Sequence, residues 1–392
     1  MTRHKLYNVF CCLLRSCAHN EQHGCLLRDK KYCAVSPADT ARGVDIEFVH
    51  VTKRFPGQQR PAVSDLCLRI EAGQICCLVG PSGGGKTTTM KLVNRLVEPT
   101  EGDILIGGRS VRTLNPVELR RGIGYVIQET GLFPHMTVAE NIAVVPRLLG
   151  WPKAQIRQRT LELLDLVNLA PAAAMAKRYP AQLSGGQRQR VGLARALAAD
   201  PPLMLMDEPF GALDHITRSR VQDEFLRVHR AVGKTVIFVT HDIDEAIKMG
   251  DRIAVFGEGG VLAQYAAPDD LLARPAGSFV ADLVGADRSL KRLALRTAGS
   301  AAKKREPADA RRQLPEVAPE TSLRVVLSVL LASGATEIVV RGGGGPVGTI
   351  TLDELRAAAE APAEDEPSPA DEPSAADEPS AAAVAEFGAE PR

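Results

Sequence analysis

Hydrophobic and polar side chains follow two patterns along the first two thirds of the chain. Residues 44–51 and 62–70 alternate between apolar and polar, which predicts two strands with one buried face each. Unbroken apolar runs predict strands buried on both faces, at residues 75–79, 203–206, 236–239 and 253–256. Helical patterns separate these runs, so the sequence predicts an α/β domain over residues 44–287. Within it, residues 130–182 are predicted to form a helical subdomain.

The pattern changes after residue 287. Residues 288–320 are basic and alanine-rich, which predicts a linker. Residues 321–358 combine two helical patterns with two short strand patterns, which predict a small α+β module. Residues 359–392 contain the sequence Asp-Glu-Pro-Ser three times, and a composition so poor in apolar bulk predicts a disordered acidic tail.

Charge is balanced overall but not locally. The 392 residues include 48 Lys and Arg against 47 Asp and Glu, a net charge of +1 that argues against a dedicated nucleic-acid-binding protein. Residues 288–312 nevertheless carry +7 and residues 353–392 carry −10. One hypothesis is that the basic segment contacts anionic lipid or folds back on the acidic tail, and the simpler alternative is that both segments are solvated. No apolar run approaches the roughly 18 residues of a membrane span, so we expect a membrane role only through a partner.

Five of the eight cysteines lie in the first 33 residues, without CxxC spacing. They offer a weak basis for a zinc site with His19 or His23. Residues 1–43 have only incomplete features of a signal sequence. We expect either a disordered leader or a start codon assigned upstream of the true one, which would then lie near Val44. Cys76 and Cys77 lie in an apolar run and are expected to be reduced core thiols.

A glycine-rich segment follows the apolar run at residues 75–79 and precedes a helical pattern. It fits the motif GxxxxGK[ST] with one further threonine, through Gly80, Pro81, Ser82, Gly83, Gly84, Gly85, Lys86, Thr87 and Thr88. Backbone N–H groups of such a loop and the following helix N-terminus bind phosphates. Lys86 is placed to bridge the β- and γ-phosphates, and Thr87 offers a hydroxyl to Mg²⁺.

Two acids end the apolar run that starts at Leu203. Open α/β sheets bind ligands at the carboxyl ends of their strands, so Asp207 and Glu208 are expected near the glycine-rich loop. We expect Asp207 to hold Mg²⁺, directly or through water, and Glu208 to polarise the attacking water.

A third motif, the run Ser184, Gly185, Gly186 and Gln187 after Leu183, lies 23 residues before Asp207. With the two sites above, it closely resembles the ATP-binding subunits of ABC transporters over residues 44–285. The resemblance implies a P-loop NTPase cassette, with a RecA-like core, an antiparallel β part and the helical subdomain.

The resemblance also implies roles for single residues. Gln128 matches the glutamine that senses Mg²⁺ and couples to the membrane subunit, and His241 matches the switch histidine at the γ-phosphate. Asp214 matches a turn that crosses the dimer. Phe55 stands where the family places an aromatic residue against adenine, although it could instead be a core residue.

The family's signature, Ser184 to Gln187, faces the ATP of a second subunit. The resemblance therefore implies a partner cassette, most simply a homodimer, together with transmembrane permease subunits and a periplasmic or lipid-anchored substrate-binding protein. Residues 125–151, 238–246 and 279–288 resemble the importers of glycine betaine, carnitine and choline. This implies a peripheral protein at the cytoplasmic face of the bacterial inner membrane, without nucleic acid as a partner.

That subfamily often carries paired CBS modules after the cassette, and residues 321–358 resemble one half-module. A structural appendage without regulatory role is the alternative. Two alternatives stay open for the whole chain: an importer ATPase for an amino acid or a sulfonate, and a soluble ABC ATPase outside transport.

Overall fold

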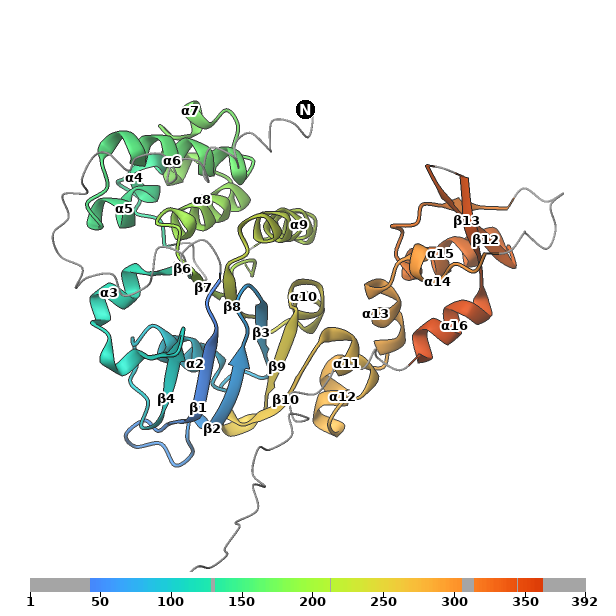
Figure 1. The fold of residues 1–392 in the computed structure, drawn as a ribbon, viewed down its shortest axis with the longest axis horizontal. Helices are drawn as coiled ribbons and strands as arrows, with labels where there is room; N and C mark the ends of the chain where they lie inside the picture. The colour runs from blue at the N-terminus through green and yellow to red at the C-terminus, as the bar shows by residue number, and fades with distance from the viewer. Residues whose placement is uncertain (1–42, 128–130, 212, 305–313, 344, 362–392) are drawn as a thin grey trace, which may run out of the picture. The chain divides into compact units, whose positions relative to one another are not determined.

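The computed structural model describes residues 43–127, 131–211, 213–304, 314–343 and 345–361. The predicted leader and the acidic tail from residue 362 lie outside these described residues, as does Gln128. The chain divides into two compact units (Figure 1). The N-terminal unit runs to residue 271 and includes residues 276–284, and the C-terminal unit comprises residues 272–275 and those from 285 onward.

The N-terminal unit is built on a six-stranded sheet in the order β10-β9-β3-β8-β7-β6. The strands are β3 (Ile75–Val79), β6 (Ile123–Val126), β7 (Leu203–Asp207), β8 (Thr235–Val239), β9 (Arg252–Phe256) and β10 (Leu262–Ala266). All neighbours are parallel except β10, which is antiparallel to β9. The four unbroken apolar runs are confirmed as strands, and every residue of β3 and β8 is buried.

A second, antiparallel sheet has the order β2-β1-β4-β5. Its strands are β1 (Ile46–Lys53), β2 (Val63–Ile70), β4 (Glu101–Ile106) and β5 (Arg109–Ser110). Phe48 of β1, Met90 of α2 (Lys86–Val93) and Leu205 of β7 belong to one apolar core, which joins this sheet to the first. The predicted antiparallel part of the fold is therefore confirmed.

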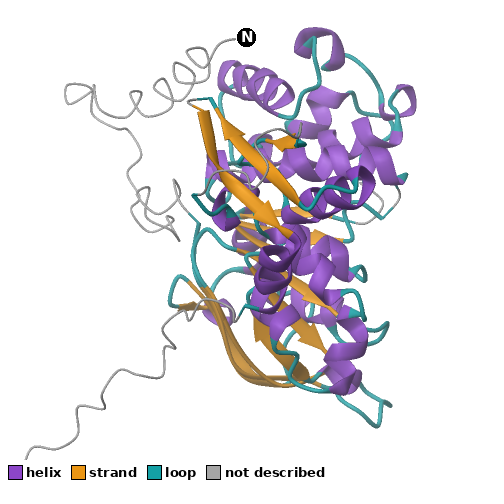
Figure 2. Cartoon of the chain, turned by 90° about the vertical axis from the view of Figure 1, so that its right-hand side faces the viewer, coloured by secondary structure: helices purple, strands orange, loops and turns teal. Residues whose placement is uncertain are grey.

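In the described residues of this unit, helices pack against the strands of the six-stranded sheet (Figure 2). Those of the predicted helical region are α4 (Val138–Ile142), α5 (Val144–Leu148), α6 (Lys153–Leu166) and α7 (Ala172–Met175). The others are α3 (Pro116–Arg121), α8 (Gly185–Leu197), α9 (His215–Val232), α10 (Ile243–Met249) and α12 (Ser278–Val284). Helix α11 (Pro268–Ala273) begins in this unit, and its last two residues belong to the C-terminal unit. Of the helices in the described part of the chain, none combines the length and apolar character needed to cross a bilayer.

The C-terminal unit is a small α+β module with its own core. Its three-stranded sheet has the order β11-β12-β13, formed by β11 (Glu316–Val317), β12 (Glu337–Gly342) and β13 (Gly345–Thr351). Helices α15 (Leu323–Ser333) and α16 (Leu352–Glu360) contribute Leu330 and Leu355 to a core that includes Ile338 and Ile350 of the sheet.

Residues 288–301 differ from the predicted basic linker, because they form helices α13 (Arg288–Leu295) and α14 (Ala298–Ala301). Leu293 of α13 is buried in the core of the C-terminal unit. Arg292 is also buried and donates hydrogen bonds to the carbonyl oxygens of Ala359 and Ala361, at 2.7 and 2.6 Å. A guanidinium at these carbonyls, which end α16, complements the helix dipole. Part of the basic composition is thus internal helix capping.

Candidate nucleotide-binding site

The glycine-rich loop connects β3 to α2, as the sequence predicts. Gly80 has a φ of 142°, and a Cβ atom there would lie 2.1 Å from the carbonyl oxygen of Phe256. Gly85, the residue before α2, has a φ of 84°, and its Cβ would lie 2.1 Å from the carbonyl oxygen of Ala62. Only glycine fits both constraints. The neighbouring strands thereby fix the path of the loop.

Lys86 begins α2 and turns its ammonium back into this loop. Its Nζ donates hydrogen bonds to the carbonyl oxygens of Gly80 (2.7 Å) and Pro81 (2.8 Å). Burial lowers the pKa of Lys86, and the negative charges of Glu208 and Asp207 oppose that shift. The loop therefore holds a buried cation that a phosphate group would stabilise.

Asp207 at the end of β7 lies against the first turn of α2. The Thr87 hydroxyl donates a hydrogen bond to Asp207 Oδ1 at 3.2 Å. Burial raises the pKa of Asp207, a shift that the Thr87 bond opposes and the charge of Glu208 reinforces. A hydroxyl and a carboxylate at this separation are the hard oxygen ligands that Mg²⁺ uses beside a nucleotide. The pair therefore fits the predicted Mg²⁺ site.

Glu208 and His241 form a second polar pair beside the loop. Glu208 has a φ of 43°, rare for a residue with a side chain, and its N–H donates to the carbonyl oxygen of Val239 at 2.9 Å. Its Oε1 lies 3.3 Å from Nδ1 of His241, whose side chain is 67% exposed. The end of β8 thus holds the backbone of Glu208, and an exposed imidazole contacts its carboxylate.

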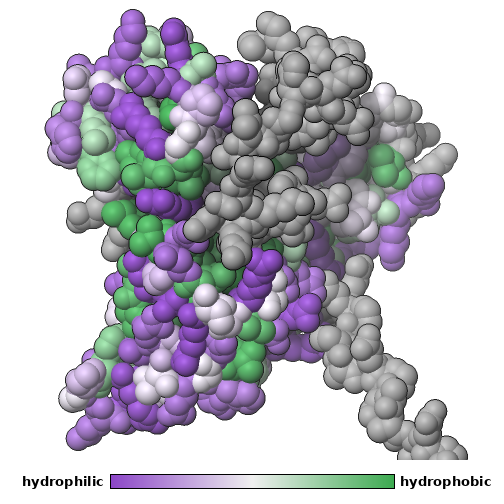
Figure 3. Space-filling view, turned by 60° about the vertical axis from the view of Figure 1, so that its left-hand side comes forward, coloured by the Kyte–Doolittle hydropathy of each residue, from purple (hydrophilic) through white to green (hydrophobic). Residues whose placement is uncertain are grey.

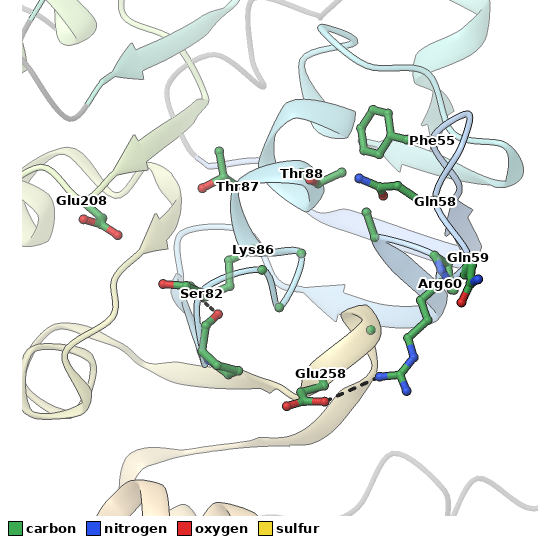
Figure 4. A pocket seen from close by; sticks show the side chains of 17 residues that line it. Phe55, Gln58, Gln59, Arg60, Ser82, Lys86, Thr87, Thr88, Glu208 and Glu258 are labelled. Carbon is green, nitrogen blue, oxygen red and sulfur yellow. Dashed lines mark hydrogen bonds and ion pairs between the residues drawn. The ribbon is translucent and has the colours of Figure 1, made fainter.

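One pocket of about 740 Å³ brings the loop together with Glu208 and Phe55. Figure 4 shows the loop side chains between Glu208 on one side and Phe55 on the other. Phe55 is half-buried and has the Lys53 ammonium 5.0 Å from its ring centre. The alternative of Phe55 as a core residue does not fit this position, because its ring belongs to the wall of an open pocket.

Ser184 to Gln187 lie at a different place, the start of α8. Ser184 caps the helix: its hydroxyl accepts from the Gln187 N–H at 3.3 Å, and its own N–H donates to Gln187 Oε1 at 3.0 Å. A Cβ on Gly186 would lie 2.9 Å from Thr217 Cγ2, so α8 packs closely on α9. None of these four residues is among those lining the pocket. The start of α8 is therefore separate from the nucleotide pocket of the same chain.

Asp214 is exposed and caps α9. Its Oδ1 accepts a hydrogen bond from the Thr217 N–H at 3.0 Å, and this backbone bond is the main cause that lowers the pKa of Asp214. The basic residues inside α8 have internal partners. Arg188 donates to the Leu183 carbonyl oxygen at 2.8 Å, and Arg190 lies 3.5 Å from a Glu224 oxygen. These contacts favour the structural interpretation of both arginines over binding of a nucleic acid.

Comparison with known proteins agrees with this geometry. Residues 63–211 match the family "ABC transporter". The osmoprotectant import ATP-binding protein OsmV of Salmonella typhimurium is 48% identical over 318 residues, which cover 80% of this chain and 81% of OsmV. The chain belongs to the ABC transporter ATP-binding family. The glycine betaine uptake system ATP-binding protein YehX of Escherichia coli is 45% identical over 316 residues, 80% of this chain and all of YehX.

A solved member of the ABC family supports the same fold. The ATP-binding cassette MJ0796, in a dimeric post-hydrolysis state bound to ADP and Pi, matches with a TM-score of 0.51 and 34% identity. The match covers 57% of this chain and 98% of that one. The expected ABC ATPase activity is thereby supported at the level of the family, as is a cassette that binds ATP.

Sequence reasoning missed part of the ABC nucleotide pocket. Gln58, Gln59 and Arg60 line it from the segment between β1 and β2, and Glu258 lines it from the turn after β9. Arg60 and Glu258 form an exposed ion pair at 3.6 Å across this side of the pocket (Figure 4). The signal available was the polar run that follows Phe55, but such runs are common in connecting segments.

Proposed function

We propose that this chain is the ATP-hydrolysing subunit of a membrane importer for quaternary ammonium osmoprotectants such as glycine betaine, carnitine and choline. The observation that carries the proposal is the pocket in which the glycine-rich loop and Glu208 converge, with Asp207 hydrogen-bonded to Thr87 of the pocket wall. The chain is also similar over most of its length to OsmV and YehX. OsmV is named as an osmoprotectant import protein, and YehX is named as part of a glycine betaine uptake system.

The predicted residues of this site have distinct tasks in the proposal. Lys86 and the loop N–H groups bind the phosphates, and Phe55 stacks on adenine. Thr87 and Asp207 hold Mg²⁺, which neutralises charge on the phosphates when it is bound, and we assign Gln128, outside the described residues, to the same ion. Glu208 accepts a proton from the attacking water, and His241 orients Glu208 and contacts the γ-phosphate.

We further propose that two copies of the chain assemble into a homodimer with composite sites. The N-terminus of α8 is the group offered to the partner's nucleotide, because a helix start with two glycines presents N–H groups to an anion. Asp214 would lie at the crossing of the two subunits. The dimeric state of MJ0796 supports this arrangement for a related cassette.

A groove in the N-terminal unit supports permease binding. It has a volume of about 310 Å³, and its lining includes Tyr125, Ile127, Phe133 and Val145. Ile127 and Phe133 are large exposed apolar side chains. Figure 3 shows apolar surface on the side where the helical region meets the sheet. We assign a transmembrane permease to this groove, which places the chain at the cytoplasmic face of the inner membrane. A periplasmic or lipid-anchored binding protein would deliver the solute.

The C-terminal unit is proposed to be a single CBS-like half-module. Its support is the order β11-α15-β12-β13-α16 around one core, which resembles the predicted half-module over residues 321–358. Regulation of transport by this unit and a purely structural role make different predictions for a chain truncated after residue 287. Regulation predicts that uptake by the truncated chain responds to osmolarity differently from uptake by the full chain, whereas a purely structural role predicts the same response.

The test is solute uptake in a strain of the source organism that lacks this gene. We expect uptake of radiolabelled glycine betaine or choline to be lost, and to return with the wild-type chain but not with Lys86→Ala. Uptake of an amino acid and of a sulfonate is measured in parallel. Loss of one of those instead, with betaine and choline uptake intact, would contradict the proposed substrate class. Co-purification with ribosomes or DNA instead of membranes would contradict a transport role.

A further inference from the structure

Three metal-ligating side chains meet on the outer face of the β1–β2 ladder, away from the nucleotide pocket. Nδ1 of His50 lies 2.8 Å from Oδ1 of Asp65 and 3.5 Å from Sγ of Cys67. One ligand atom from each residue lies within 4.8 Å of the others, and all three residues are exposed. The buried residues of these strands, such as Phe48, Leu66 and Leu68, point to the opposite face.

Two irregularities in the ladder bring the three side chains to one face. The register of β1 on β2 shifts between Phe48 and Val51 and again between Val51 and Lys53. At the first shift Val49 and His50 are both exposed, whereas strict alternation after buried Phe48 would turn His50 inward. At the second, Asp65 is exposed although it lies two residues after buried Val63. β-bulges re-aim side chains in this way and are common at functional sites.

Both re-aimed residues hold a left-handed backbone conformation. His50 has a φ of 49° and Asp65 a φ of 46°, values that are uncommon for residues with side chains but more frequent for histidine and aspartate than for other types. The neighbouring strand β4 makes room for the first bulge through Gly102. Any residue with a Cβ atom at that position would place it 2.1 Å from the His50 carbonyl oxygen. The Asp65 N–H donates to the Thr52 hydroxyl at 3.0 Å, which supports the second. The fold therefore maintains two left-handed positions whose side chains converge.

We propose that His50, Asp65 and Cys67 form a binding site for a divalent metal ion of the Zn²⁺ class. Thiolate, imidazole and carboxylate are the ligands that zinc uses. Zn–S and Zn–N bonds of about 2.3 and 2.05 Å at a tetrahedral angle put sulfur and nitrogen about 3.6 Å apart, close to the observed 3.5 Å. The same geometry asks for about 3.3 Å between nitrogen and oxygen, so His50 and Asp65 separate by about half an ångström from 2.8 Å.

Proton balance follows from the present contacts. The ion takes the place of the proton that His50 Nδ1 shares with Asp65, and that proton moves to Nε2 of the imidazole. The Cys67 thiol releases its proton to solvent. Binding thus releases a proton for each metal ion. Because the three residues are exposed, a water molecule completes the tetrahedron, as in zinc sites with three protein ligands. The ion bridges the two strands that lead into and out of residues 54–62, part of the nucleotide pocket wall.

The test uses the full chain with the five N-terminal cysteines replaced by serine, namely Cys11, Cys12, Cys17, Cys25 and Cys33. Zn²⁺ binding is measured against a chromogenic chelator without nucleotide and with excess Mg²⁺, so that oxygen ligands near Asp207 are occupied. We expect a single equivalent of Zn²⁺ in this parent. Cys67→Ser, His50→Gln and Asp65→Asn should each weaken it by at least about tenfold, the lower limit for loss of a supporting contact.

Co²⁺ provides a second readout that separates ligation from a change in folding. The parent should show a thiolate-to-Co²⁺ charge-transfer band that Cys67→Ser abolishes, while ATP binding by that variant is unchanged. His135→Gln, which removes an exposed imidazole elsewhere, is the matched control and should bind Zn²⁺ as the parent does. The absence of Zn²⁺ binding by the parent would overturn the proposal. Binding of one equivalent of Zn²⁺ by both Cys67→Ser and His50→Gln would also overturn it.

Discussion

Replacing Glu208 with glutamine separates the chemical step from nucleotide binding. Glutamine keeps the size of the side chain, and its amide can still contact His241 Nδ1, which lies 3.3 Å from the Glu208 carboxylate. The backbone of Glu208 is anchored by its N–H bond to Val239 and changes little. The substitution therefore removes the ability to accept a proton and leaves the shape of the site intact.

The size of the effect follows from that single loss. A positioned general base contributes about 10²–10⁴-fold to the rate, or about 3–5 kcal/mol of activation free energy. The contacts of Lys86 to the loop and of Thr87 to Asp207 do not involve Glu208. We therefore expect the rate of ATP hydrolysis to fall by that factor without weaker ATP binding.

Single-turnover hydrolysis of radiolabelled ATP and equilibrium binding of ATP, both with the full chain, measure the two quantities separately. Asp223→Asn, which neutralises an exposed acid on α9, is the matched control and should hydrolyse ATP at the wild-type rate. Retention of more than about a tenth of the wild-type rate by Glu208→Gln would refute the assignment of the base. Loss of ATP binding would instead show that Glu208 helps to hold the nucleotide.

Three further outcomes test the surrounding structure. Gly85→Ala should weaken ATP binding by about fivefold or more, because the left-handed backbone and the clash with Ala62 in the pocket wall cost about 1–3 kcal/mol. Gly108 is left-handed too, with a φ of 70°, but it lies outside the pocket and its Cβ would meet nothing within 4 Å, so Gly108→Ala should leave ATP binding unchanged. Burial raises the pKa of Asp207, so its ionised form destabilises the Mg²⁺-free fold. Asp207→Asn should therefore raise the melting temperature at neutral pH. The gain should shrink as pH falls through that raised pKa and vanish below the ordinary pKa of an aspartate in the unfolded chain. A gain independent of pH would contradict this cause. Leu293→Ala should destabilise the C-terminal unit by about 2–5 kcal/mol, seen as faster hydrogen exchange in β12, whereas exposed Leu290→Ala should leave exchange unchanged.

The nucleotide site was accessible from the sequence because its signals are local. The glycine-rich loop directly follows β3, and Asp207 ends an unbroken apolar run, so each motif appears beside the strand that positions it. The carboxyl ends of parallel strands lie at one edge of a sheet, which brings the two motifs together. Arg60 and Glu258 enter the same pocket from loops nearly 200 residues apart. No periodicity connects them, because their proximity depends on the tertiary fold.

The bulges at His50 and Asp65 lay beyond sequence reasoning for a related reason. Residues 44–51 alternate well enough to predict a strand, and the strand is found, but alternation assumes one residue opposite one residue. Where the pairing shifts, two neighbouring side chains share a face, and the sequence shows only an apolar Val49 beside a polar His50. Such a shift is visible only once the partner strands β2 and β4 are placed.

The charged segment after the cassette shows why composition gave a wrong expectation of a basic linker, whereas periodicity predicted the strands of the cassette correctly. Its basic residues suggested a solvated linker or a lipid-binding stretch, yet Arg292 and Arg296 donate to carbonyl oxygens at the end of α16, and Lys291 lies 3.2 Å from an Asp287 oxygen. These contacts are partly buried, and such contacts are screened less by salt than fully exposed charges are. A net charge of +7 therefore overstates what residues 288–312 can offer to an anionic surface. The charge available to a partner is the part that the fold leaves without an internal acceptor, and only the folded chain reveals it.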